Sequence, residues 1–94
     1  MRRITIKDER WEKNEHHKLE AYVNDTGDLV LAGYDAGDSV KEHYDDFDHE
    51  YWHTVKAEYV PAVLLWLIKE KFESAHAFVK WLEEKEIAHD SMSF

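Results

Sequence analysis

Hydrophobic and polar residues alternate in the N-terminal half of the chain, and their period predicts strands. Ile4 and Ile6 are separated by polar residues, which is typical of a short strand that we expect at a sheet edge. Residues 8–17 keep no sustained period, and they fit either a loop or a ragged continuation of that strand. Residues 19–23 and 29–34 then alternate on either side of the turn-forming sequence NDTGD. This arrangement predicts a β-hairpin.

A short helix is predicted after the hairpin. Ser39 and Glu42 have the S-x-x-E spacing of a capping box, so we expect a helix of about two turns from Val40 to Asp45 or Asp46. Aromatic and β-branched residues alternate again over 50–56. That alternation predicts one more strand.

The C-terminal third changes to a helical period. Over about 58–72, a core-facing stripe is formed by Val60, Val63, Leu64, Leu67 and Ile68. Pro61 is tolerated in the first turn of this helix, where its missing N–H costs no bond. Ser74 is placed to cap a second helix, whose apolar stripe consists of Ala75, Phe78, Val79 and Leu82.

Together these elements predict a single α+β domain over residues 1–94. We expect a small antiparallel sheet of three or four strands, packed on one face by the two C-terminal helices, with the short helix inserted before the last strand. The 94 residues are 44% hydrophobic, which is enough for a core without a disulfide or a structural metal. The pattern does not decide whether residues 1–18 join the sheet.

The charge of the chain predicts the class of partner that it binds. The formal net charge is -9, and the range 35–50 holds seven carboxylates against Lys41 alone. A field of that sign repels phosphate backbones and attracts basic surfaces. We therefore expect no direct nucleic-acid binding and a basic protein as partner.

Composition also restricts the compartment and the chemistry. The chain has no cysteine, its first residues lack a signal-peptide core, and its longest apolar run, 60–68, is half a membrane span. We expect a soluble, cytoplasmic protein that does not bind a membrane. No nucleophile elbow or glycine-rich phosphate loop occurs in the sequence, so we predict a protein that is not an enzyme and needs no cofactor.

The stretch EHYDDFDHEYWH, residues 42–53, allows an alternative function, a small metal-binding domain or a metal-dependent enzyme. His43, His49 and His53 with neighbouring carboxylates are suitable ligands for zinc, iron or manganese. On a strand, however, His49 and His53 would lie roughly 13 Å apart, which is too far for both to reach one ion. HEYWH matches the helical H-E-x-x-H motif in its letters, but its aromatic residues disfavour a helix.

The same stretch fits a protein-binding surface better. Aromatic residues anchor interfaces, and the carboxylates around them accelerate encounter with a basic partner. The predicted partner-binding residues are Tyr44, Asp45, Asp46, Asp48, Glu50, Tyr51 and Trp52. A third alternative is a homodimer that buries Trp66 and Trp81, which lie on the flanks of the two helices.

Part of the chain, residues 27–67, resembles a family of short bacterial proteins with no assigned activity. The resemblance consists of an L-x-G-x-D-x-G strand end at Leu31 to Gly37, an aromatic T-V strand at Asp48 to Val55 and an A-E-x-V-P helix start at Ala57 to Pro61. It implies a small bacterial or phage α+β domain and transfers no catalytic residue. By analogy, small acidic proteins of this build act as immunity proteins or as inhibitors of toxins and nucleic-acid-handling enzymes.

Overall fold

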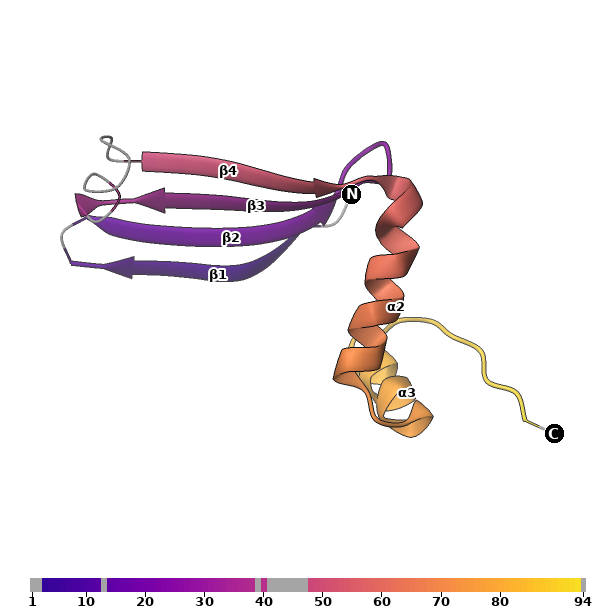
Figure 1. Ribbon diagram of the computed structural model, residues 1–94. Helices are drawn as coiled ribbons and strands as arrows, with labels where there is room; N and C mark the ends of the chain where they lie inside the picture. Colours follow the sequence, from indigo (N-terminus) through magenta and orange to yellow (C-terminus); the bar gives the residue numbers. More distant parts are fainter. Residues whose placement is uncertain (1–2, 13, 39, 41–47, 94) are drawn as a thin grey trace. The chain divides into compact units, whose positions relative to one another are not determined.

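The computed structural model describes residues 3–12, 14–38, 40 and 48–93 (Figure 1). The chain divides into two compact units, Met1–Val60 and Pro61–Phe94, which are described separately. That residues 1–94 form one domain stays a prediction.

The first unit contains a four-stranded antiparallel sheet. Its strands pair in chain order, β1-β2-β3-β4 (Figure 1). The strands are β1 Arg3–Trp11, β2 Glu15–Val23, β3 Leu29–Ala36 and β4 Asp48–Val55. With the two C-terminal helices, this sheet confirms the predicted α+β class, and β1 lies at an edge as expected.

Most of the ambiguous range 8–17 is strand, because β1 continues to Trp11 and β2 begins at Glu15. In this part of β1 and β2, the residues that face each other across the strands are mostly polar, so no alternating apolar pattern occurs. The Nε2 atom of His16 lies 2.8 Å from Oδ1 of Asp8 on the facing strand. Asn14 takes the turn between the strands with a φ of 61°, a conformation that asparagine tolerates well.

Register assigns the paired strand residues to one of two sheet faces, because directly opposed residues share a face. We name each face after its most prominent β4 aromatic residue. The Trp52 face carries four cross-strand rows: Arg3, Tyr22, Val30 and Thr54; Thr5, Glu20, Ala32 and Trp52; Asp8, Lys18, Tyr34 and Glu50; Arg10, His16, Ala36 and Asp48. The Tyr51 face carries the alternate residues, among them Leu19, Gly33 and Tyr51 in one row and Glu9, His17, Asp35 and His49 in the next.

The loop between β2 and β3 is organised by its own side chains, as NDTGD predicted. The side-chain oxygen of Asn24 accepts hydrogen bonds from the backbone N–H groups of Thr26 (3.1 Å) and Asp28 (2.9 Å). Gly27 adopts a φ of 85°, which suits glycine. Asp28 is buried, and its Oδ1 accepts a 2.8 Å bond from the N–H of Ala57. This bond ties the loop to the residue that begins the 3-10 turn η1, Ala57–Tyr59.

The two predicted C-terminal helices are present, and each begins within two residues of its predicted start. Helix α2 spans Val60–Lys71 with Pro61 in its first turn, and α3 spans Ala75–Glu84. The hydroxyl of Ser74 caps α3 by accepting from the N–H of Ala77. Phe72 packs edge-on against Phe78 and Trp81, with ring centroids 5.3 and 5.6 Å apart.

Three expectations about these elements stay predictions. The packing of the two helices on one sheet face is one, and a homodimer through Trp66 and Trp81 is another. The helix predicted from Val40 to Asp45 or Asp46 falls mainly on 41–47, outside the described residues. Within the described part of the chain, no helix is long and apolar enough to cross a membrane.

Replacing Asp28 with alanine should lower the melting temperature by several degrees, because the buried carboxylate that accepts hydrogen bonds from the N–H of Ala57 and the hydroxyl of Thr26 is lost. Asp25→Ala, an exposed change in the same loop, is the matched control. The bond from Ala57 is the main reason that the pKa of Asp28 is lowered in the folded chain. The stabilisation is therefore complete above the unfolded-chain pKa of about 3.9 and is lost as the pH falls through the lower folded value.

Thermal melts at neutral and acid pH check this prediction. Equal melting temperatures for the two alanine variants would show that Asp28 does not anchor the loop.

Candidate functional site

The predicted partner-binding residues divide between the two faces of the sheet. Asp48, Glu50 and Trp52 lie together on the Trp52 face, whereas Tyr51 points to the opposite face. The other three predicted residues, Tyr44, Asp45 and Asp46, lie outside the described residues. A single flat partner surface therefore reaches the first group without Tyr51.

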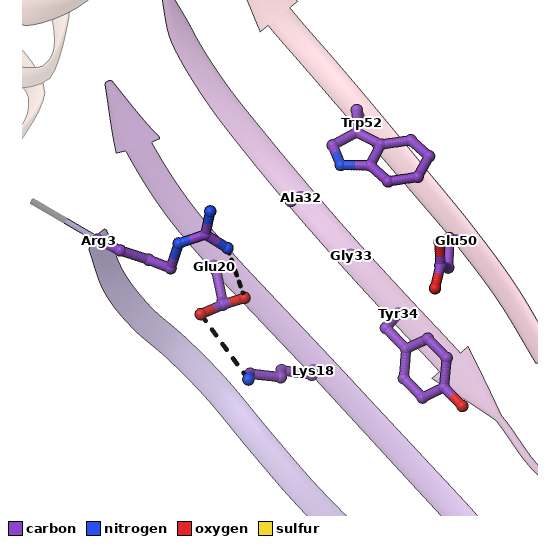
Figure 2. Close-up of a pocket in the computed structure, with 8 residues that line it drawn as sticks. All are labelled: Arg3, Lys18, Glu20, Ala32, Gly33, Tyr34, Glu50 and Trp52. Atoms are coloured by element: carbon purple, nitrogen blue, oxygen red, sulfur yellow. Dashed lines mark hydrogen bonds and ion pairs between the residues drawn. The ribbon is translucent and has the colours of Figure 1, made fainter. Parts of the chain in front are cut away.

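A shallow pocket of about 180 Å³ opens on the Trp52 face (Figure 2). Ala32 and Gly33 of β3 form its floor, and the rings of Trp52 and Tyr34 flank the carboxylate of Glu50. The remaining lining side chains are Arg3, Lys18 and Glu20. The floor is low because the residue directly opposite Trp52 is alanine.

Charges in this pocket are arranged unequally. Glu20 is engaged by two cations, Arg3 at 3.2 Å and Lys18 at 3.8 Å. Arg3 also lies over the ring of Tyr22, 4.1 Å from its centroid. Glu50 is exposed, and none of the ion pairs among the described residues involves it. Glu50 is therefore the carboxylate of the pocket that remains available to an outside cation.

On the opposite face, Tyr51 covers Gly33. A side chain at position 33 would collide with the Tyr51 ring, so glycine is required there for the ring to lie against the sheet. Tyr51 also separates two histidines on its own strand. Its ring centroid is 5.7 Å from that of His49 and 5.8 Å from that of His53.

This spacing bears on the alternative metal site. His49 and His53 do not converge, because the Tyr51 ring stands between them, and His43 lies outside the described residues. Across the described ranges, no group of three or more histidine or acidic side chains is arranged to hold a metal ion.

The Tyr51 face contains a charged cluster that the sequence reasoning missed. His17 lies between two carboxylates, with Nδ1 2.7 Å from Oδ1 of Asp35 and Nε2 2.8 Å from Oε2 of Glu15. A neutral imidazole donates through only one nitrogen, so two carboxylate acceptors favour the charged form. The hydrogen bond to Asp35, followed by that to Glu15, raises the pKa of His17 against the opposing effect of burial.

The surroundings of His17 indicate a structural role. Both ring nitrogens are occupied, so neither is left to accept a proton or to bind a ligand. Trp11 covers the cluster, with its ring centroid 5.1 Å from that of His17. Gly37 has a φ of 126° and lies close to Glu15. A side chain at position 37 would collide with the side chain and the backbone of Glu15. One signal of the His17 cluster was present in the sequence, the i, i+2 spacing that places Glu15 and His17 on the same side of a strand. The third member, Asp35, could be identified only from the pairing of β2 with β3.

Comparisons with known proteins add no relative. No protein-family model matches the chain, and neither the curated proteins nor the solved structures include a match. The resemblance to a bacterial family therefore stays a prediction.

The His17 cluster predicts a fall in stability on the alkaline side of neutrality. Because the pKa of His17 is raised on folding, its stabilisation is complete below the unfolded value of about 6.5 and is lost as the pH rises through the folded value. The melting temperature of the wild type should fall across that range. The His17→Gln variant should lack this part of the pH dependence.

An NMR titration of the His17 ring tests the cause directly. Asp35→Asn should lower its pKa more than Glu15→Gln does, since the bond to Asp35 has the larger effect. A wild-type pKa at or below about 6.5 would refute the charged cluster.

Proposed function

We propose that this chain is a non-enzymatic, acidic protein-binding module that covers a basic surface of another protein. The observation that carries the proposal is the joint position of Asp48, Glu50 and Trp52 on one exposed face of β4. Carboxylates beside an exposed aromatic ring are the combination that steers and then anchors a basic partner.

The position of β4 in the sheet supports this role. β4 is the last strand in the order β1-β2-β3-β4, so the described strands pair with it on one side alone. Trp52 is 59% exposed, and Asp48 and Glu50 are exposed beside it. A partner can therefore approach these side chains from the face and from the edge of the sheet.

Charge over the whole chain acts in the same direction. A net charge of -9 raises the rate of encounter with basic proteins at low ionic strength and disfavours acidic ones. The narrower form of the proposal is an immunity or inhibitor protein of bacteria or phage, acting in the cytoplasm. Such a protein would block the groove of a toxin or of a nucleic-acid-handling enzyme by occupying it with carboxylates.

Charge reversal on β4 tests the proposal. The partner is first isolated by affinity capture from a bacterial lysate at low salt, and its association rate is then measured by stopped flow. Asp48→Lys combined with Glu50→Lys should slow association by about tenfold or more at low salt. The difference from the wild type should shrink at high salt, where exposed charges are screened.

A matched double variant separates local from overall charge. Glu83→Lys with Glu84→Lys makes the same change in net charge at two exposed positions in the last turn of α3. This variant should slow association much less. Equal slowing by both double variants, or capture of a partner without a basic surface, would contradict the proposed binding face.

A further inference from the structure

We propose that the pocket above Ala32 accepts one guanidinium group, the side chain of an arginine in the partner protein. The guanidinium lies between the rings of Trp52 and Tyr34 and pairs with the carboxylate of Glu50. This inference rests on the proposed function for its partner, and it names the single contact that anchors the complex.

The size of the pocket selects a side chain over a metabolite. Sites for small molecules typically enclose roughly 300–1,000 Å³ and bury most of the ligand. The pocket here has about 180 Å³ and opens broadly onto the sheet face (Figure 2). One planar side-chain head fits this space, while the rest of the residue stays with the partner.

The sheet register shapes the pocket for a flat group. Trp52 is directly opposite Ala32, and Glu50 is directly opposite Tyr34, so the two rings are diagonal neighbours across β3 and β4. Diagonal neighbours lie roughly 7–8 Å apart on one face, within reach of large aromatic side chains. The small Ala32 side chain leaves the space between them open.

The Trp52 ring and the Glu50 carboxylate, two groups that attract cations, favour a cationic ligand in the pocket. Other aromatic rings of the chain have a cation over them: Arg3 lies over the half-buried Tyr22, and Lys69 lies 5.0 Å from the ring centroid of the exposed Trp66. The Trp52 ring has no such cation among the described residues. Beside it, Glu50 has no ion-pair partner there, so a ring face and a carboxylate are both open to the same ligand.

The other charges of the pocket set the position of the guanidinium. Arg3 and Lys18 sit on the Glu20 side and neutralise it, so an incoming cation is repelled from there toward β4 (Figure 2). Guanidinium suits that position better than ammonium. Its plane stacks on tryptophan, and its fork of N–H groups matches a carboxylate.

A titration with a small probe tests the site without any partner protein. N-acetyl-argininamide, which resembles an arginine within a chain, is added to the isotope-labelled protein, and NMR signals are followed. The indole N–H of Trp52 and the amides of Tyr34 and Glu50 should shift and saturate. N-acetyl-citrullinamide, the neutral analogue of the same shape, should leave them unchanged, and the lysine amide should bind more weakly.

Matched variants assign the binding to individual groups. Glu50→Gln should weaken binding by about threefold to fivefold, as expected for an exposed charged pair. Trp52→Ala should abolish it, whereas Trp52→Phe should retain part of it. Trp66→Ala is the control, since Trp66 is 60% exposed and Trp52 is 59% exposed. Lys18→Gln should strengthen binding by about twofold to threefold, because it removes a nearby repulsive charge.

Two results would overturn the site. One is equal binding of the citrulline probe, and the other is equal loss on replacing Trp52 and Trp66. If the arginine probe fails while capture of a basic partner still depends on Asp48 and Glu50, the pocket is refuted and the binding module stands. If the probe binds but no basic partner depends on those carboxylates, the guanidinium pocket is supported and the proposed function is refuted.

Discussion

The antiparallel pairing of β3 with β4 is the constraint on which the rest of the account depends. This register places Trp52 opposite Ala32 and Glu50 opposite Tyr34, and it sends Tyr51 to the other face against Gly33. A shift by one residue would exchange the two faces. If β4 shifted in this way, the pocket would lose Trp52 and Glu50 together, because both lie on β4.

The two faces consequently serve different purposes. On the Tyr51 face, side chains satisfy one another: His17 is held by two carboxylates, and the Tyr51 ring fills the space that Gly33 leaves. On the Trp52 face, Glu20 is balanced by Arg3 and Lys18, but Glu50 keeps its charge uncompensated among the described residues. An unsatisfied carboxylate costs little at an exposed position, and there it can attract a partner.

Local signals in the sequence were sufficient for much of the fold. The NDTGD loop, the Ser74 cap and the helix that contains Pro61 each depend on neighbouring residues, so they could be predicted. The prediction of a core-facing stripe on that helix was wrong, because no residue of α2 is buried and Leu64 and Leu67 are more than half exposed. The length of β1 could not, because its charged residues are exposed and leave no apolar period. For the site, the sequence indicated which acidic and aromatic residues were candidates, but not how they are arranged. Which of its aromatic and acidic residues share a face depends on strand register, and the His17 cluster depends on Asp35, a residue 18 positions away.

Mapping the contact surface in the complex with the captured partner tests the central claim most directly. Cross-saturation from the partner, detected by NMR on the labelled chain, reports which side chains it touches. The account predicts strong effects at the indole of Trp52, at Tyr34 and at Glu50, with none at His17 or Tyr51. Effects concentrated on His17 and Tyr51 would contradict it, because the partner would then bind the opposite face of the sheet.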